Sequence, residues 1–410
     1  MNYVIVGGGP AAVACIEGIR SCDRDGSITV ISKEPHPAYF RPLISYYLEG
    51  KSREQNIFCR DDDFYRNNST ATVFGTVTSL DSDGRTVALS SGEVIPYDRL
   101  CVCTGSSPFV PPMAGLDTVP RQFTFMTIDD ALAIERAVDK NTRVLIIGAG
   151  LIGLKCAEGL LDRAGSVTVC DLAPRVLSSI LDDDCAAIVR EHLENCGIRF
   201  SLSNTAERFD TDTAYMKDGT TIEFDVLILA LGVRPNIGFF KDAGGMCNRA
   251  ILVENDMTTS LADIYAAGDC VEQYDITFGA KRIMALLPNA IIGGYTAGVN
   301  MAGGNRRFDN AAPMNSIGFF GLHIMTAGTY GDASQMIEEK GENSVKRFFI
   351  RDNKLIGFII VGDVKGAGIY TDLVRTQVDL SALDFDMLRK DPNLIPFGQI
   401  YRRKTLRGVV

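Results

Sequence analysis

Two stretches of the chain repeat one pattern of hydrophobic and polar positions. In each, a short apolar run leads into a glycine-rich turn, and a longer run of small and apolar residues follows. In the first stretch, residues 3–6 predict a buried strand and residues 12–19 a helix. In the second, residues 143–147 predict the strand and residues 154–163 the helix. Further strands are expected over 27–31 and 166–170. The order strand, helix, strand predicts parallel sheets of the βαβ kind.

The remaining pattern completes an α/β chain with a smaller domain at its end. Short strands are expected over 71–80, 86–89, 97–103 and 224–231, a strand that ends at Gly268-Asp269, and a helix of small residues over 290–301. From Asn310 the character changes, and strands are expected over 316–321, 345–350 and 355–361, with a hairpin turn at 351–354 and a helix over 367–377. The predicted fold class is α/β, with two Rossmann-like three-layer domains and a small C-terminal α+β domain.

The first glycine turn has the spacing of a dinucleotide fingerprint. Gly7, Gly9 and Ala12 stand at the three positions of G-x-G-x-x-A, where they allow a tight turn, approach of a pyrophosphate to the backbone, and close packing of helix on strand. The helix N-terminus offers free N–H groups to phosphates. Glu34 follows the second strand, where a carboxylate can accept hydrogen bonds from ribose hydroxyls. A glycine turn without a ligand is the alternative interpretation.

The second glycine turn reads G-x-G-x-x-G, from Gly148 through Gly150 to Gly153, and Asp171 ends the following strand. A carboxylate there accepts from the 2′-hydroxyl of NAD(H) and repels the 2′-phosphate of NADP(H), so NADH is predicted. Arg175 could offset that repulsion. Two fingerprints in one chain indicate two dinucleotides, a flavin and a nicotinamide, because hydride exchange joins such a pair.

Composition narrows the function classes further. The 410 residues carry a formal net charge of −10, which argues against nucleic-acid binding. No apolar run approaches the length of a membrane span, and the first strand leaves no room for a signal peptide, so a cytoplasmic protein is expected. The 11 cysteines are then expected as thiols, with Cys101 and Cys103 in the core. Neither they nor the 3 histidines form a ligand pattern, so no metal site is predicted.

Together these motifs resemble the FAD-dependent pyridine-nucleotide oxidoreductases, the superfamily related to the disulfide reductases. The paired fingerprints, the segment Cys103-Thr104-Gly105, the segment 232–236 and the stretch 259–269 carry the resemblance. It implies that the nicotinamide domain is inserted in the flavin domain. The FAD-binding domain is then expected to comprise residues 1–110 and 231–308, the NAD(H)-binding domain 111–230, and the C-terminal α+β interface domain 309–410.

The resemblance also implies which residues bind each cofactor. In such proteins the first fingerprint and Glu34 hold the ADP half of FAD, and the aspartate of the Gly-Asp pair holds the ribityl chain. The residues expected to bind FAD are Gly7, Gly9, Pro10, Ala11, Ala12, Glu34, Arg41, Pro42, Val77, Thr104, Gly105, Gly268 and Asp269. Those expected to bind NAD(H) are Gly148, Gly150, Leu151, Ile152, Gly153, Asp171 and Gly232.

The subgroup follows from a missing cysteine. Members that reduce disulfides or peroxide carry a reactive cysteine in the loop after the first acidic residue, whereas this chain has none between Glu34 and Cys59. Electrons must then leave the flavin directly. The form Tyr-x-Arg-Pro-Leu-x-Ser at 39–45 looks like NADH:rubredoxin oxidoreductases and the flavin module of NADH-dependent nitrite reductases. The resemblance implies transfer from NADH through FAD to an external one-electron carrier, an acidic iron–sulfur protein or a rubredoxin. The chain could also run in reverse as the NAD-reducing subunit of a redox assembly, and a homodimer or larger complex is possible.

Other hypotheses stay open at this point. The chain could be an NADH oxidase that reduces oxygen, or a redox-sensing flavoprotein with slow turnover. Lys155 stands where many relatives have glutamate, and it is a candidate catalytic residue that stabilises negative charge on the flavin or binds a cofactor phosphate. A solvent-facing helix residue is the alternative. The basic tail with Arg402, Arg403, Lys404 and Arg407 could steer an acidic carrier, or it is simply a solvated end.

Overall fold

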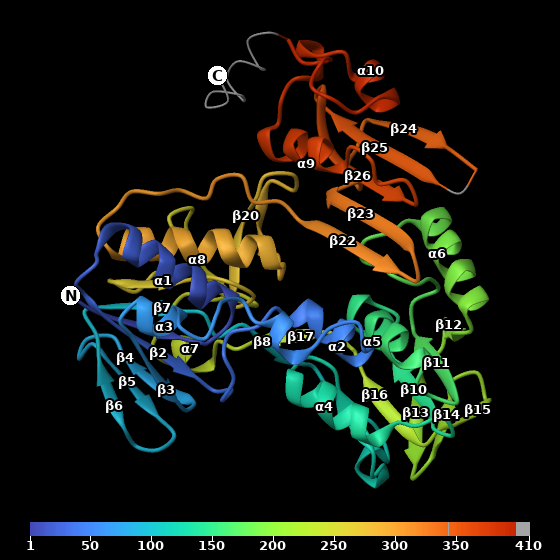
Figure 1. Cartoon of the computed structure of the whole chain (residues 1–410), viewed down its shortest axis with the longest axis horizontal. Coiled ribbons are helices and arrows are strands. Elements are labelled where there is room, and N and C mark those ends of the chain that lie inside the picture. Colours follow the sequence, from blue (N-terminus) through green and yellow to red (C-terminus); the bar gives the residue numbers. More distant parts are fainter. Residues whose placement is uncertain (343, 399–410) are drawn as a thin grey trace. The chain divides into compact units, whose positions relative to one another are not determined.

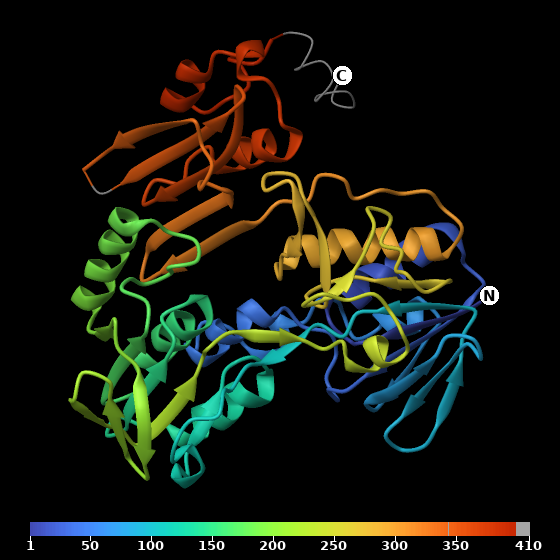
Figure 2. The ribbon, with the colours of Figure 1, turned by 180° about the vertical axis from the view of Figure 1, so that it is seen from behind.

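The computed structural model describes residues 1–342 and 344–398 (Figures 1 and 2). The basic tail proposed as a docking element therefore lies outside the described residues. The chain divides into two compact units. The first comprises Met1–Gln273 and Lys281–Phe308, and the second comprises Tyr274–Ala280 and the described residues from Asp309 onward.

A parallel five-stranded sheet in the order β19-β7-β1-β2-β3 forms the centre of one half of the first unit. Its strands are β1 (Asn2–Val6), β2 (Ser27–Ser32), β3 (Thr70–Phe74), β7 (Arg99–Val102) and β19 (Ile264–Ala266). Two helices, α1 (Pro10–Cys22) and α8 (Leu287–Met301), lie side by side against this sheet (Figures 1 and 2). A Cβ at Gly298 would lie 2.0 Å from the Cys15 carbonyl oxygen, so the small residues of α8 are what lets the two backbones touch.

A second parallel sheet, in the order β12-β11-β10-β16-β9, repeats this design within the same unit. Its strands are β9 (Gln122–Thr124), β10 (Arg143–Ile147), β11 (Ser166–Asp171), β12 (Arg199–Leu202) and β16 (Val226–Leu229). Helices α4 (Ile128–Ala137), α5 (Leu151–Leu161) and α6 (Asp183–Cys196) belong to it. A capping box at Thr127 fixes the start of α4, and Gly197 in the left-handed region ends α6.

Smaller elements complete the first unit. One antiparallel sheet comprises β4 (Val77–Asp81), β5 (Thr86–Leu89) and β6 (Val94–Pro96), and another comprises β13 (Ala206–Asp210), β14 (Thr213–Met216) and β15 (Thr221–Glu223). Strands β8 (Ser106–Pro108) and β17 (Val233–Pro235) pair where the chain passes between the two large sheets. Strand β18 (Ile251–Leu252) pairs with β20 (Val271–Asp275), and β20 pairs with β21 (Ala280–Ile283); these last two strands include residues of the segment 274–280 of the second unit. The short helices are η1 (Arg41–Leu43), α2 (Ile44–Leu48), η2 (Glu54–Ile57), α3 (Phe64–Asn67), η3 (Leu116–Thr118) and α7 (Gly238–Asp242).

The second unit is an antiparallel sheet in the order β22-β23-β26-β25-β24 with helices beside it (Figure 1). Its elements are β22 (Met314–Phe319), β23 (Leu322–Gly328), β24 (Gln335–Lys340), β25 (Val345–Arg351), β26 (Lys354–Val361), α9 (Ala367–Thr376), η4 (Leu380–Ala382) and α10 (Phe385–Lys390). The rings of Phe348, Phe358, Tyr370 and Phe385 meet edge to face in its core. The hairpin predicted at 351–354 is present, with Asp352 and Asn353 at positive φ.

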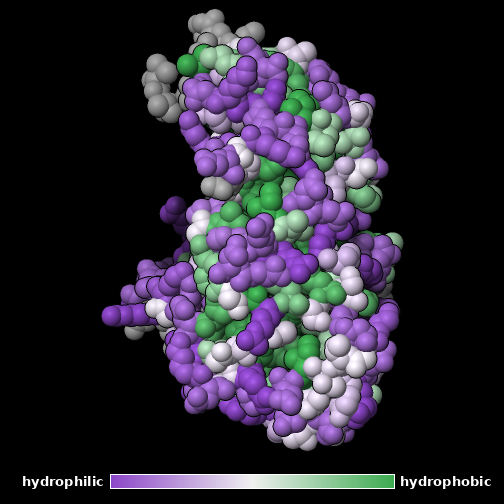
Figure 3. All heavy atoms as spheres, turned by 90° about the vertical axis from the view of Figure 1, so that its right-hand side faces the viewer, coloured by the Kyte–Doolittle hydropathy of each residue, from purple (hydrophilic) through white to green (hydrophobic). Residues whose placement is uncertain are grey.

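The α/β class with a small C-terminal α+β domain is confirmed. Most predicted elements are present with ends shifted by one to three residues, such as α1, which begins at Pro10 and ends at Cys22. The pattern missed many other elements, among them β23 and β24 in the second unit and α4, α6 and β12 in the first. Among the described residues, no helix combines the length and the apolar character that crossing a membrane would require. Polar side chains gather over much of the face seen in Figure 3, and hydrophobic ones show between them.

Candidate functional site

The first fingerprint forms an open cradle at the carboxyl end of β1. Gly7 adopts φ +116°, and a Cβ there would lie 2.1 Å from the Cys103 carbonyl oxygen, so only glycine fits. Gly9 caps α1 with extended backbone, and a Cβ there would meet no atom within 4 Å. Pro10 opens the helix, and Ala11 and Ala12 follow it, both buried. The backbone at Gly9 therefore borders open space in front of a helix N-terminus, which suits a pyrophosphate.

Glu34 lies beyond the end of β2 and is held by two later residues. Its carboxylate accepts hydrogen bonds from the Tyr39 hydroxyl and from the Arg41 guanidinium. Arg41 also donates to the Met126 carbonyl oxygen at 2.8 Å. Burial raises the pKa of Tyr39, so the phenol stays protonated and can donate. A carboxylate has about four acceptor positions, so Glu34 keeps capacity for ribose hydroxyls beside these two donors. The role of Tyr39 was not predicted.

Further predicted FAD residues lie at the same edge of the sheet. Gly268 (φ +87°) follows β19 and presents Asp269, whose carboxylate lies 3.5 Å from the Ser106 hydroxyl. Burial raises the pKa of Asp269, and the nearby Arg41 guanidinium opposes that shift. Gly105, also at positive φ, accepts a hydrogen bond from the Asn236 N–H at 3.0 Å.

The other predicted FAD residues come from neighbouring segments. The Thr104 hydroxyl donates to the Asn236 carbonyl at 2.6 Å, which joins the end of β7 to the segment after β17. Pro42 lies in η1, and Val77 begins β4 shortly after β3 ends. Because parallel strands end at one edge, these segments converge where ligands of open α/β sheets bind.

The second fingerprint repeats the geometry of the first. Gly148 has φ +119°, and a Cβ there would lie 2.3 Å from the Ala230 carbonyl oxygen. Gly150 caps α5, and a Cβ there would meet nothing within 4 Å. A Cβ at Gly153 would lie 1.9 Å from the Gly148 carbonyl oxygen, so this glycine gives the close helix–strand approach. Leu151 and Ile152 form the first turn of α5, and Gly232 (φ +101°) follows β16.

Asp171 ends β11 beside this second cradle. One carboxylate oxygen accepts from the Ala149 N–H at 2.6 Å and the other from the Ala173 N–H at 2.7 Å. The carboxylate is thus fixed by backbone donors on both oxygens. A carboxylate held in this way retains lone pairs for ribose hydroxyls, and it stays a barrier to an added phosphate.

Lys155 lies on α5, facing α2 instead of solvent. Its side chain is 15% exposed and forms an ion pair with Glu158, which is 4% exposed. Its Nζ lies 4.7 Å from the centre of the Tyr46 ring, within the range of a cation–π contact. The alternative that Lys155 is a solvent-facing helix residue is therefore wrong. The pairing with Glu158 was not predicted, although the i,i+3 spacing of opposite charges was the available signal.

Residues 36–48 bind the two halves of the first unit together. The Tyr47 hydroxyl donates to Glu135 on α4 at 2.9 Å, and Arg163 donates to the Leu48 carbonyl at 2.6 Å. His36 lies 3.0 Å from Asp129, at the start of α4. With the bond from Arg41 to the Met126 carbonyl, these contacts attach this segment, which we call the strap, to α4 and to the end of α5. Helix α2, the last part of the strap, packs against α4 and α5.

The cysteines near the first cradle are buried. Burial raises the pKa of Cys59 to about 12 and that of Cys270 to about 12, so thiolates are disfavoured at neutral pH. Cys101 and Cys103 are buried with their sulfurs 3.5 Å apart. Over residues 1–342 and 344–398, no group of three or more histidine, cysteine or acidic side chains could hold a metal ion.

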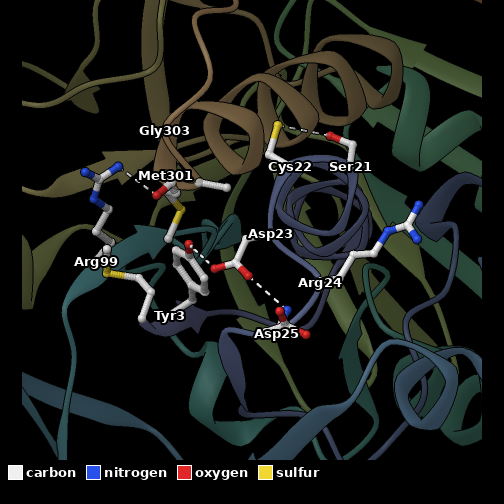
Figure 4. Close-up of a pocket in the computed structure, with 11 residues that line it drawn as sticks. Tyr3, Ser21, Cys22, Asp23, Arg24, Asp25, Arg99, Met301 and Gly303 are labelled. Atoms are coloured by element: carbon white, nitrogen blue, oxygen red, sulfur yellow. Dashed lines mark hydrogen bonds between the residues drawn. The ribbon is translucent and has the colours of Figure 1, made fainter.

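A surface cavity of about 560 Å³ lies at the opposite end of the first sheet (Figure 4). It is lined by the start of β1, by Arg99 at the start of β7, and by the C-terminal ends of α1 and α8. The Tyr3 hydroxyl donates to Asp23 at 2.8 Å, and Arg99 donates to the Met301 carbonyl at 2.7 Å. The bond from Arg99 satisfies a backbone carbonyl at the C-terminus of α8. The cavity is therefore separate from the fingerprint end of the sheet.

Two family models together match most of the chain. The family model Pyridine nucleotide-disulphide oxidoreductase matches residues 1–306, and the model Rubredoxin NAD+ reductase C-terminal domain matches residues 313–378. The chain is 31% identical to the NADH-dependent phenylglyoxylate dehydrogenase subunit epsilon of Aromatoleum evansii, over 93% of each chain. It is 35% identical to an NADH oxidase of Methanocaldococcus jannaschii, over 88% of each.

A solved structure, the covalent putidaredoxin reductase–putidaredoxin complex, contains a chain with the same fold. It matches with a TM-score of 0.87 and 23% identity, over 94% of this chain and 95% of that one. The family model spans both fingerprints and the Gly268-Asp269 pair, the features from which the two cradles are built. The chain therefore belongs to the pyridine nucleotide-disulphide oxidoreductase family.

Proposed function

We propose that this chain is an FAD-dependent NADH oxidoreductase that passes electrons to an external one-electron carrier. The main observation that supports this proposal is the pair of open cradles, at Gly9 and Gly150, in one compact unit. Bound FAD would supply the chemistry, because a flavin accepts a hydride from NADH and releases electrons one at a time. The chain's own residues bind and orient: Glu34, Arg41 and Asp269 on the flavin side, and Asp171 on the nicotinamide side.

The kind of electron acceptor is proposed from the cysteines near the flavin site and from the C-terminal domain. A thiol relay needs a reactive cysteine beside the flavin, but the strap contains none, and Cys59 after it is buried with a raised pKa. Electrons would then leave directly to a protein carrier. The match to a rubredoxin reductase C-terminal domain supports a rubredoxin or another iron–sulfur protein as that carrier. The similarity to a subunit of an NADH-dependent dehydrogenase supports a place in a larger redox assembly. We also propose a cytoplasmic location.

NADH is proposed over NADPH as the donor. The carboxylate of Asp171 is fixed beside the cradle by the N–H groups of Ala149 and Ala173. It would accept from a 2′-hydroxyl and repel a 2′-phosphate. Steady-state kinetics with both coenzymes test this choice, and a lower KM for NADPH than for NADH would overturn it.

A second candidate function is NADH oxidase activity, which the similarity to the Methanocaldococcus jannaschii protein favours. Anaerobic rapid-mixing measurements at the flavin absorbance band separate the two. The protein is first reduced with NADH, and then mixed with a rubredoxin, a [2Fe–2S] ferredoxin or oxygen. Fast reoxidation by a carrier with slow reoxidation by oxygen is expected. Fast reoxidation by oxygen alone would establish the oxidase instead, and absence of reduction by NADH would reject both.

A further inference from the structure

The loop that leaves Asp171 returns to the second fingerprint. The Ala149 N–H donates to the Asp171 carboxylate at 2.6 Å, and the Leu177 N–H donates to the Ala149 carbonyl at 2.9 Å. Both ends of the segment 171–177 are thus attached to the residue between the first two fingerprint glycines. Arg175 is the only cationic residue in this segment. It is therefore a cation placed near the edge where the adenosine ribose of a dinucleotide is proposed to bind.

Arg175 is held by residues that follow this loop in the chain. Its Nη1 donates to the Asp183 carboxylate at 2.8 Å, its Nε to the Leu181 carbonyl at 3.2 Å, and its Nη2 to the Ser178 carbonyl at 3.4 Å. All three guanidinium nitrogens therefore have an acceptor within 178–183. Asp183, in the first turn of α6, is the charged member of this set, and its side chain is 84% exposed.

We propose that Asp183 is a specificity-determining residue that restrains Arg175 and withholds it from the coenzyme. A guanidinium is well suited to pair with a phosphate, because its donors match two phosphate oxygens. Released from Asp183, Arg175 would pair with a 2′-phosphate and offset the repulsion from Asp171. The restraint thus adds a second barrier to NADP(H) beside the Asp171 carboxylate. This inference rests on the proposed use of NADH.

The test uses two ligands that differ only in the 2′-phosphate, 5′-AMP and 2′,5′-ADP, with the FAD-loaded full chain. In Asp183→Asn the affinity for 2′,5′-ADP is expected to rise about fivefold, the order of a surface ion pair exchanged for an arginine–phosphate pair. The affinity for 5′-AMP should stay within about twofold, because adenosine contacts are unchanged. Equilibrium titration gives both values, and the KM ratio of NADPH to NADH should fall in parallel.

The Arg175→Ala background separates release of the arginine from simple loss of negative charge. If Arg175 is the ligand, Asp183→Asn has no effect on 2′,5′-ADP affinity once Arg175 is alanine. A gain that persists in the double variant would be a long-range charge effect and would overturn the proposal. Glu194→Gln breaks the exposed pair with Arg190 on the same helix and serves as the matched control, with no change expected.

The outcomes also separate this inference from the proposed function. A chain that NADH reduces, but whose Asp183→Asn variant keeps the wild-type ratio of the two affinities, overturns the inference alone. Equal weakening of both ligands would show that Asp183 only supports the loop, which also overturns it. A wild-type chain that binds neither 5′-AMP nor NADH would reject the proposed function, and the inference with it.

Discussion

Alanine at Gly7 and at Gly9 should have opposite consequences, although both glycines belong to one fingerprint. Gly7 has φ +116°, and its Cβ would lie 2.1 Å from the Cys103 carbonyl oxygen, a backbone atom of the neighbouring strand. Gly9 has φ −87° and ψ −173°, which any residue adopts, and its Cβ would meet nothing within 4 Å. We therefore expect Gly7 to be required by the fold and Gly9 by the ligand.

The free energies of unfolding follow from these two environments. Gly9→Ala removes backbone freedom from the unfolded chain at a compatible position, so the apoprotein should be about 0.4–1 kcal/mol more stable. Gly7→Ala places a side chain in a conformation that costs about 1–2 kcal/mol, and the contact with Cys103 must also push β1 and β7 apart. A loss of about 3 kcal/mol or more is expected for Gly7→Ala.

Among the molecules that fold, Gly9→Ala should weaken FAD binding more than Gly7→Ala does. The added methyl of Gly9→Ala occupies the space through which a pyrophosphate would approach the N-terminus of α1. Losing one charge-assisted hydrogen bond costs about 1.5–3 kcal/mol, so FAD affinity should fall by about 10- to 100-fold. The apoprotein is measured by urea unfolding and then titrated with FAD by flavin fluorescence. An unchanged FAD affinity in Gly9→Ala, or equal destabilisation by both changes, would refute this reasoning.

The second fingerprint supplies an internal replicate of the same experiment. Gly148→Ala should destabilise the apoprotein, since its Cβ would lie 2.3 Å from the Ala230 carbonyl oxygen. Gly150→Ala should raise the stability of the apoprotein slightly, as Gly9→Ala does, and leave FAD content intact while weakening NADH binding. If Gly150→Ala released FAD and left NADH binding untouched, the assignment of the two cradles would be reversed.

Three further predictions concern charge and thiol reactivity. Burial raises the pKa of Asp269, so the folded protein favours the protonated carboxyl group. This group therefore stabilises the fold at low pH, and that stabilisation is lost as the pH rises through the raised pKa. Asp269→Asn should therefore stabilise the apoprotein at pH 7 by about 1 kcal/mol, which calorimetry would show as a rise of a few degrees in melting temperature. Titration with FAD should show a lower affinity in the same variant. Lys155→Met should lower the free energy of unfolding by about 3 kcal/mol, because it removes the cation that pairs with the buried Glu158 carboxylate, and Lys155→Met/Glu158→Leu should recover most of this loss. An unchanged rate of flavin reduction by NADH in the stable double variant would remove Lys155 from the cofactor site. With Ellman's reagent the exposed Cys22 should react first, and rapid labelling of Cys59 in the folded protein would contradict its burial.

The parts of the site that the sequence predicted are those fixed by local backbone geometry. Gly7 and Gly148 are required by positive φ and by a carbonyl of the next strand, and such constraints leave a fixed spacing in the sequence. Glu34 and Asp171 were predicted from their place after a strand. Their partners were not, because Arg41 and the Ala149 N–H reach them through folding that spacing does not encode.

The missed elements have different physical reasons. Strand β24 alternates exposed with partly buried positions at the edge of its sheet, so it carries little apolar signal. Helix α6 did carry a signal, since Asp182 accepts from the Cys185 N–H at its start and Gly197 ends it. The contacts of the strap could not be predicted, because Tyr47 and Glu135 are far apart in sequence and pair only through tertiary packing.

The proposed function requires the strap to hold the two dinucleotide-binding halves of the first unit in a fixed relation. Hydride transfer needs reacting atoms about 3–3.5 Å apart, so two separately bound dinucleotides are useful only if their domains hold a fixed relation. Arg41 meets this need directly, since one guanidinium bonds Glu34 beside the flavin cradle and the Met126 carbonyl next to α4. Tyr47 and Arg163 repeat the connection one helix further along. A change in any of these three residues should therefore slow the reduction of bound FAD by NADH more than it weakens either cofactor, because it disturbs the relation between two intact cradles.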